Sequence, residues 1–186
     1  MKTLETERLL LRSWRGVDFD DYYEFASHPD VGPNAGWAPH FHREISYQIL
    51  QRYVEDDDTW AIALKDGGKV IGNIGLHPDP IRPYEGVNML GYALNPAFWG
   101  NGYMTEAVGA VIEFFFEEEK MDLLCVYHYE FNERSKRVIK KSGFVPEGVL
   151  RRGIAMHNRA VVNRFCYSMT AEEYYQRKRL NEMRDF

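Results

Sequence analysis

Residues 95–107, NPAFWGNGYMTEA, place two glycines around an asparagine, directly before a segment whose apolar residues recur at helical spacing. Gly100 and Gly102 therefore remove side chains where a helix is predicted to begin. The first N–H groups of a helix have no partner inside it, and the helix dipole puts partial positive charge at that end. Several N–H donors can bind an anion there if no side chain intrudes. The stretch predicts a phosphate site, although glycines that only shape a turn would look the same.

Two well-known phosphate motifs fit this stretch poorly. A dinucleotide fingerprint needs a third glycine, whereas the register here is Gly100-x-Gly102-x-x-Thr105. A P-loop needs a Gly-Lys-Ser/Thr sequence, which the stretch lacks. Thr105 nevertheless adds a hydroxyl one turn into the predicted helix.

The surrounding segments predict an α+β fold. Met104, Ala107, Val108, Val111 and Phe115 form the apolar stripe of an amphipathic helix. We expect that helix to cross between two parallel neighbours in a mostly antiparallel sheet. With 186 residues, a single domain spanning 1–186 is expected. The predicted strands are 7–14, 59–64, 70–77, 86–94, 123–129 and two within 144–170 that turn near 157–158. The predicted helices are 18–29, 43–57, 104–115, 132–143 and 171–180, with a loop at 31–41.

Composition limits the function classes. The 23 Lys and Arg against 28 Asp and Glu give a net charge of −5, which disfavours nucleic acid as a partner and suits a cationic substrate such as an amine. Cys125 and Cys166 lie in apolar strand-like runs and are interpreted as buried free thiols, and no metal site is expected. The start lacks the pattern of a signal peptide, and no apolar run suggests a membrane span, so a cytoplasmic location is the default expectation.

A second motif stands about thirty residues downstream. The stretch NERSKRVIKKSGF, residues 132–144, has a local interpretation, with Asn132 as the N-cap and Gly143 as the C-cap of a short helix. Together with GYALNPAFWGNGYMTEA, however, it resembles the GNAT superfamily of N-acetyltransferases, most closely the branch with the ribosomal-protein N-terminal acetyltransferases. The resemblance covers nearly the whole chain. It implies a GNAT fold with a mixed, mostly antiparallel sheet of six to seven strands, splayed between strands four and five and flanked by about four helices.

The resemblance also implies acetyl-CoA as the donor and places its contacts. The diphosphate would lie on the backbone N–H groups of Gly100–Met104, with Thr105 assisting, and Trp99 stands where many members carry Gln or Arg. The pantetheine arm would run beside residues 92–94, and Asn132 would hydrogen-bond it. Lys136 and Lys140 are weaker candidates for the nucleotide end. The full set of predicted coenzyme contacts is Tyr92, Ala93, Leu94, Trp99, Gly100, Asn101, Gly102, Tyr103, Met104, Thr105, Asn132 and Ser135.

Catalysis is harder to assign. Many members of the superfamily use a tyrosine as general acid where this chain has Ile139, so we assign protonation of the departing thiolate to Ser135, with Asn132 beside it. An α-amine with a pKa of about 7.7–8.0 loses its proton at pH 7 for roughly 1 kcal/mol, whereas a lysine needs about 4–5 kcal/mol. Glu85 is the candidate carboxylate base, in a segment that looks like loop. His77 and His157 could act through water, and Asn88 stands where many relatives carry glutamate.

The resemblance implies an acceptor site on the opposite side of the splayed strands, walled by the first two helices and the last strands. Trp37 is either a wall of that site or an anchor for its loop. The candidate acceptor-binding residues are Trp37, His40, His77 and His157. Three functions stay open: acetylation of a peptide N-terminus, acetylation of a small amine such as a polyamine, aminoglycoside or amino acid, and acetyl-CoA sensing without turnover. Either a monomer or a homodimer is compatible with the sequence.

Overall fold

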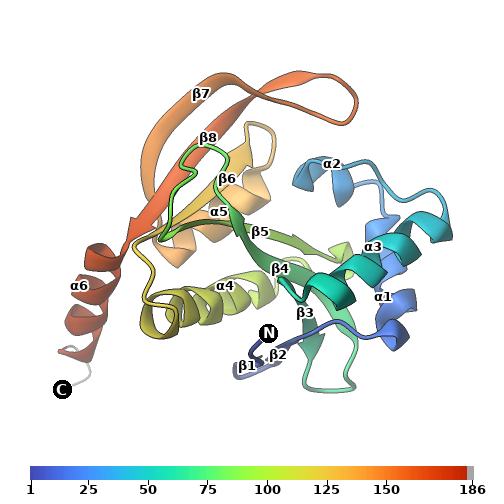
Figure 1. The fold of residues 1–186 in the computed structure, drawn as a ribbon, viewed down its shortest axis with the longest axis horizontal. Helices are drawn as coiled ribbons and strands as arrows, with labels where there is room; N and C mark the ends of the chain where they lie inside the picture. Colours follow the sequence, from blue (N-terminus) through green and yellow to red (C-terminus); the bar gives the residue numbers. More distant parts are fainter. Residues whose placement is uncertain (184–186) are drawn as a thin grey trace.

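One eight-stranded sheet runs through the protein, whose computed structural model describes residues 1–183 (Figure 1). The strand order is β1-β2-β3-β4-β5-β6-β8-β7. All neighbouring pairs are antiparallel except β5 and β6, which are parallel. The strands are β1 Leu4–Glu5, β2 Leu9–Arg12, β3 Thr59–Leu64, β4 Val70–Pro78, β5 Val87–Leu94, β6 Leu123–Tyr129, β7 Val145–Ala155 and β8 Val161–Thr170.

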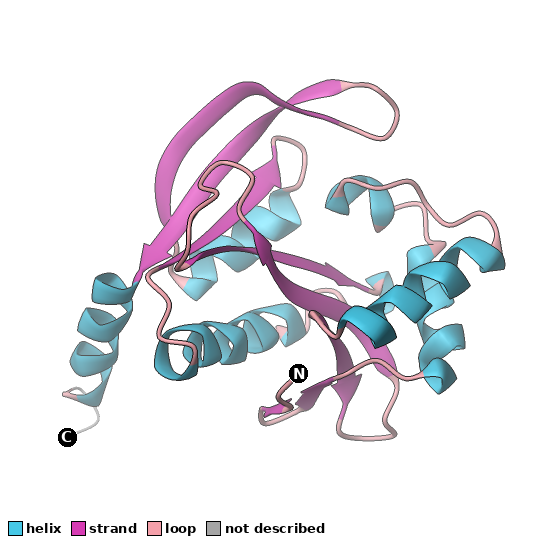
Figure 2. Ribbon diagram, viewed as in Figure 1, coloured by secondary structure: helices cyan, strands magenta, loops and turns pink. Residues whose placement is uncertain are grey.

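Helices lie on both sides of the sheet (Figure 2). The helices are α1 Phe19–Ala26, α2 Gly32–Ala35, α3 Arg43–Asp56, α4 Tyr103–Glu113, α5 Glu133–Ser142 and α6 Ala171–Glu182. Short 3-10 turns precede α1 and α4, at Gly16–Asp18 and Pro96–Phe98, and α4 continues as a π-helical turn at Phe114–Glu118. No helix of residues 1–183 is both long and apolar enough to cross a membrane.

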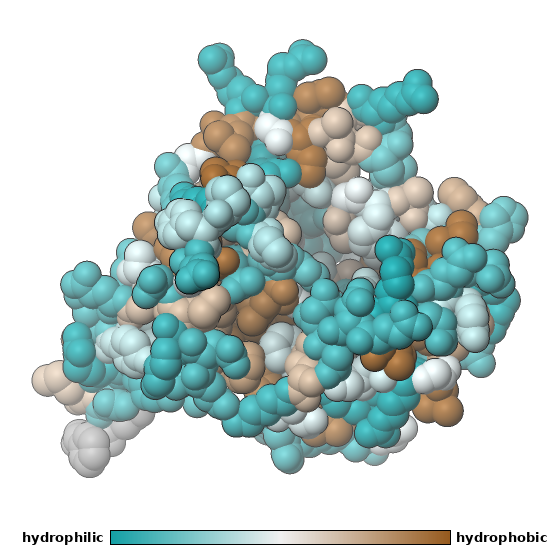
Figure 3. All heavy atoms as spheres, in the orientation of Figure 1, coloured by the Kyte–Doolittle hydropathy of each residue, from teal (hydrophilic) through white to brown (hydrophobic). Residues whose placement is uncertain are grey.

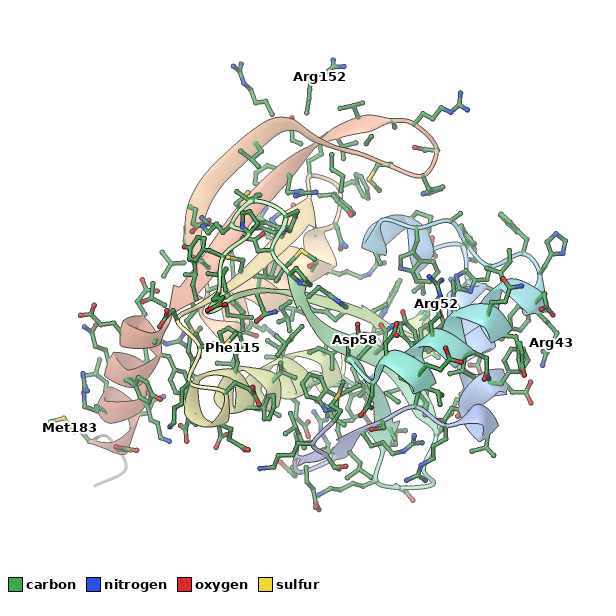
Figure 4. The ribbon with its side chains drawn as sticks, viewed as in Figure 1. Arg43, Arg52, Asp58, Phe115, Arg152 and Met183 are labelled. Atoms are coloured by element: carbon green, nitrogen blue, oxygen red, sulfur yellow. The ribbon has the colours of Figure 1, made fainter. Side chains whose placement is uncertain are left out.

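Each face of the sheet has its own core. The predicted stripe of α4, represented by Ala107, Val108 and Val111, is fully buried against one face, together with Ile139 of α5. Side chains of α1 and α3 pack on the other face around Phe25 and Leu50. Burying a large apolar side chain contributes about 1.5–3 kcal/mol, so these two layers hold the sheet between them. Phe115, labelled in Figure 4, ends the α4 stripe in the same core.

The sheet opens between β5 and β6. The two strands pair only from Val87 with Leu123 to Leu90 with Val126. Beyond that point, β5 continues along β4 to the pair Leu94–Gly72, while β6 continues along β8 to the pair Tyr129–Arg164. Because each strand follows its other neighbour, the two diverge. The predicted splay between the fourth and fifth long strands is confirmed at this position.

The structure confirms the predicted class and most elements, with some differences. Residues 1–183 contain six α-helices instead of the expected four or so. The sheet has eight strands instead of six to seven, because β1 is a two-residue strand too short to show a period. The segment predicted as loop at 31–41 contains α2, a single turn rich in glycine and proline. The helix predicted over 104–115 gives way to the π-helical turn after Glu113. Cys125 and Cys166 are buried and free, as predicted.

Candidate functional site

A pocket of about 480 Å³ lies at the open end of the splay. Its walls come from the chain around α2, the end of β5, the glycine turn with the start of α4, and one face of α5. The register explains why β5 has free backbone groups there. Asn95 N–H donates to Ile71 O of the neighbouring strand β4. Because hydrogen-bonded residues alternate along an antiparallel ladder, the backbone N–H and C=O groups of Tyr92 and Leu94 point away from β4 and toward the gap.

The glycine turn presents unpaired backbone donors to this pocket. The first bond of α4 runs from Glu106 N–H to Gly102 O at 3.0 Å, and no side chain caps the helix. The N–H groups of Tyr103, Met104 and Thr105 precede that bond, so no carbonyl of the helix reaches them. Partial positive charge therefore gathers at the pocket wall, where an anion would be stabilised.

The conformation of the turn explains why glycine is needed. Gly100 and Gly102 both have φ of +83°, a left-handed conformation that costs side-chain-bearing residues about 1–2 kcal/mol. A Cβ at Gly100 would meet nothing within 4 Å in the protein itself. Crowding by the protein is thus not the reason for glycine at 100. The left-handed backbone requires it, and it leaves open space in front of the N–H groups.

Hydrogen bonds from Thr6 and Arg8, in the turn between β1 and β2, fix the glycine turn. Glu106 accepts hydrogen bonds from Thr6 Oγ1 at 2.6 Å, Arg8 N–H at 2.8 Å and Arg8 Nε at 2.7 Å. Arg8 also donates to Asn101 O at 3.0 Å. Burial alone would raise the pKa of Glu106, but these bonds outweigh it and lower the pKa below its ordinary value. Glu106 therefore holds the turn as a carboxylate and is not placed as a base.

Asn101, whose backbone N–H is a predicted coenzyme contact, does not line the pocket. Its side-chain amide donates back to Phe98 O and Trp99 O, both at 3.2 Å, and it is exposed. Trp99 instead forms part of the wall, with its indole N–H on Leu94 O at 2.9 Å and the Arg134 guanidinium 4.1 Å from its ring centre. Trp99 thus fixes the end of β5 to the turn.

The start of α5 brings Asn132 and Ser135 into the same pocket. Asn132 caps the helix by accepting from Ser135 N–H at 3.0 Å, and its amide donates to Asn34 O of α2 at 2.9 Å. Both ends of this side chain are engaged, so Asn132 ties α2 to α5. The Ser135 hydroxyl lies 2.8 Å from the Tyr92 hydroxyl of β5.

The basic side chains on the pocket wall differ from those predicted. Lys136 pairs with Glu133 at 2.9 Å, and neither it nor Lys140 lines the pocket. The lining cations are Arg134, Arg137 and Lys141. Residues three, four and seven apart share one helix face, so these three lie together while positions 136 and 140 point elsewhere. That spacing is the signal by which the sequence could have identified them.

Glu85, the predicted carboxylate base, is not brought to the site. It is exposed in the turn before β5, whereas the pocket lies at the other end of that strand. The strand from Val87 to Tyr92 alone spans five residue steps, or about 17 Å at the usual strand rise. Asn88, also near the start of β5, donates to His77 O at 3.3 Å.

The predicted acceptor residues are scattered around the opposite face of the sheet. His40 is buried with its Nδ1 2.8 Å from Ser46 Oγ, and burial lowers its pKa, so it belongs to the packing of the loop and not to an open surface. Trp37 packs on the α1–α3 core and against the His40 ring at 5.0 Å. This contact supports the interpretation of Trp37 as an anchor.

His77 and His157 lie in more open positions. Side chains alternate along β4, so His77 faces away from the α4 core to which Ile74 belongs. A Cβ at Gly91 would lie 3.2 Å from the His77 ring, which places the imidazole over the first β5 residue beyond the parallel pairing. His157 is exposed in the turn between β7 and β8. Arg152 of the same hairpin extends into solvent (Figure 4).

The surface is hollowed between the β7–β8 hairpin and the helices α2 and α3 (Figure 3). In Figure 1 the turn of the hairpin extends toward the side of the molecule that carries α2. Of the predicted coenzyme contacts, all but Asn101 line the pocket. The lining residues not predicted from the sequence are Arg134, Arg137 and Lys141, the apolar Phe98 and Val138, and the wall around α2 at Asp30, Val31, Asn34 and Ala35.

Comparison with known proteins gives consistent matches. Residues 8–145 match the acetyltransferase (GNAT) domain. The uncharacterized N-acetyltransferase YoaA of Bacillus subtilis is 28% identical over 153 residues, covering 80% of this chain and 85% of that protein. A GNAT-family acetyltransferase from Bacillus anthracis superposes with a TM-score of 0.84 at 23% identity, covering 92% of this chain and 100% of that one. The ribosomal-protein-S5-alanine acetyltransferase from Vibrio fischeri superposes with a TM-score of 0.75 at 21% identity, covering 93% and 98%.

Proposed function

This chain belongs to the GNAT family of acetyltransferases and is an acetyl-CoA-dependent N-acetyltransferase, and we propose that its acceptor is the α-amine of a peptide N-terminus. The pocket fits the coenzyme by its own chemistry. Unpaired N–H donors at the start of α4, the open space beside Gly100 and three cationic side chains on α5 suit a diphosphate-bearing ligand. Tyr92 and Leu94 offer backbone groups along which an amide-containing arm can be hydrogen-bonded.

The amine and the leaving group are handled on opposite faces of the sheet in this proposal. His77, over Gly91 on the acceptor face, receives the proton that the amine must lose, directly or through water. The neutral nitrogen attacks the thioester carbonyl, the carbon–sulfur bond breaks, and the electron pair stays on sulfur. Ser135, on the coenzyme face, donates the proton that converts the thiolate to a thiol.

One observation carries the choice of a peptide α-amine. The acceptor face is an open hollow between the hairpin and α2 (Figure 3). His77 lies over Gly91, where β5 and β6 part. An α-amine with an ordinary pKa near 8 loses its proton at a cost of about 1 kcal/mol at pH 7, within the capacity of an imidazole, whereas a lysine costs about 4–5 kcal/mol. The fold shared with the alanine acetyltransferase from Vibrio fischeri supports the same acceptor class.

The test is thiol release from acetyl-CoA with a panel of amines. We expect release with peptides beginning with Ala or Ser, and no stimulation by the same peptides with a blocked N-terminus. Mass spectrometry should locate the acetyl group on the α-nitrogen. Stimulation only by polyamines or other small amines would replace the peptide proposal, and binding of acetyl-CoA without release by any amine would favour a sensor.

A further inference from the structure

Two hydroxyls meet across the coenzyme pocket. Tyr92 Oη of β5 and Ser135 Oγ of α5 are 2.8 Å apart, and both residues line the pocket. Tyr92 and Ser135 are 43 positions apart in sequence, on β5 and on the helix α5 that follows β6. Tyr92 stands two residues beyond the last β5–β6 pair at Leu90, where the strands have separated enough to admit a ligand.

Either hydroxyl of this pair can donate to the other, and Tyr92 Oη also lies 3.4 Å from the Ser135 carbonyl oxygen. The Ser135 N–H is already bound by Asn132 Oδ1, which fixes the first turn of α5 and the position of the serine side chain. A serine hydroxyl has one proton and can accept as well as donate. When Tyr92 donates to Ser135 Oγ, the serine proton is free to point at a third atom in the pocket.

We propose that Tyr92 is a proton-relay residue that acts through Ser135 on the sulfur of the departing thiolate. The inference rests on the proposed function and deepens its second half-step. As the carbon–sulfur bond breaks, the Ser135 proton moves to sulfur and the Tyr92 proton moves to Ser135 Oγ. The phenolate then takes a proton from solvent, which has received the proton lost by the amine. The products are the amide and the free thiol, and no proton is left over.

The environment keeps the Tyr92 hydroxyl protonated. Tyr92 is held between the sheet and α5, and this burial raises the pKa of its hydroxyl above the ordinary value, despite the opposing effect of the bond to Ser135. The phenol therefore stays protonated at neutral pH.

A kinetic test compares Tyr92→Phe, Ser135→Ala and the double variant, with thermal unfolding as a check on folding. We expect Tyr92→Phe to lower kcat about 10-fold while the acetyl-CoA affinity from calorimetry stays within about 2-fold. In a relay, Tyr92 has no route to sulfur once Ser135 is alanine, so the double variant should match Ser135→Ala within about 2-fold. Tyr175→Phe is the matched control. Tyr175 lies on α6, and the substitution removes a tyrosine hydroxyl that donates to Phe116 O at 2.8 Å. Wild-type kcat in Tyr92→Phe, or losses that multiply in the double variant, would overturn the relay.

A second readout needs no acceptor and separates this inference from the proposed function. Ultraviolet thiolate absorbance reports the pKa of the thiol of bound CoA, which a hydroxyl donor lowers. We expect Ser135→Ala to raise that pKa by about one unit and Tyr92→Phe to raise it by a smaller amount. A thiol pKa in Tyr92→Phe equal to that in the wild type would refute the relay even if transfer to peptides is observed. Failure of every amine in the release assay would instead refute the acceptor class.

Discussion

The two faces of the splayed sheet are built in different ways. The coenzyme face uses consecutive main chain from β5 through the glycine turn, joined by one face of α5. The proposed acceptor face draws on β4 and the β7–β8 hairpin, which are far apart in sequence, and α2 borders both this face and the coenzyme pocket. A site made of backbone in consecutive residues leaves a local pattern, whereas a site made of separate side chains depends on the fold. The comparison predicts that substitutions on the two faces affect different kinetic constants.

The largest effect is expected at the hydroxyl that serves the leaving group. Ser135→Ala should lower kcat about 100-fold, the lower limit for a lost general acid, with acetyl-CoA affinity nearly unchanged. Steady-state thiol release and calorimetry measure the two quantities. Unchanged turnover would remove Ser135 from the mechanism and with it the assignment of acid chemistry to the coenzyme face.

The glycine turn should show the opposite signature. In Gly100→Val the backbone strain and a branched side chain in front of the N–H donors should weaken acetyl-CoA binding about 30-fold, or roughly 2 kcal/mol. Gly109→Ala is the matched control, since that glycine is exposed in the middle of α4 and a Cβ there meets nothing within 4 Å. The control should bind normally and unfold at a slightly higher temperature, because alanine favours a helix. Equal affinity in the two variants would contradict the backbone account.

An acceptor-face substitution sharpens the comparison from the other side. His77→Asn should lower kcat/KM for the peptide about 10-fold, because the amine proton loses its acceptor, and should leave acetyl-CoA affinity unchanged. Calorimetry and initial rates over a series of peptide concentrations measure these effects. A loss of acetyl-CoA affinity would show that His77 serves the coenzyme face and that the two faces are not independent.

The smallest effects are expected for the exposed charges on the pocket-lining face of α5. Arg137→Ala and Lys141→Ala should each weaken acetyl-CoA binding about 3-fold, less at high salt, because exposed charges are screened. Lys136→Ala, on the other side of the same helix, should bind as the wild type does. Calorimetry at two salt concentrations distinguishes the three. A larger loss in Lys136→Ala than in Arg137→Ala would reverse the assignment of the basic face.

The sequence predicted what local rules control. The stripe of α4 and the position of the two glycines before it are properties of neighbouring residues, so both could be recognised before the fold was known. The left-handed backbone at Gly100 and Gly102 is shown only by the structure. Helical spacing also places Arg137 and Lys141 on one face of α5, but the sequence alone does not show that this face lines the pocket. α2 could not be predicted, since one turn containing Gly32 and Pro33 has the composition of a loop.

The remaining differences depend on tertiary contacts. The burial of His40 against Ser46 and the meeting of Tyr92 with Ser135 arise only when distant segments pack. Glu85 is close to β5 in sequence, but it precedes the start of that strand, whereas the pocket lies at the strand's other end. The resemblance predicts where the acceptor site lies, but the contacts of its residues depend on the fold.

The most direct measurement is a crystal structure of the protein with acetyl-CoA. The account predicts diphosphate oxygens within about 3.2 Å of the backbone nitrogens of Tyr103, Met104 and Thr105, next to the open space at Gly100. It also predicts the coenzyme sulfur beside Ser135. A complex with the diphosphate bound elsewhere, and those three N–H groups facing only water, would contradict the central claim.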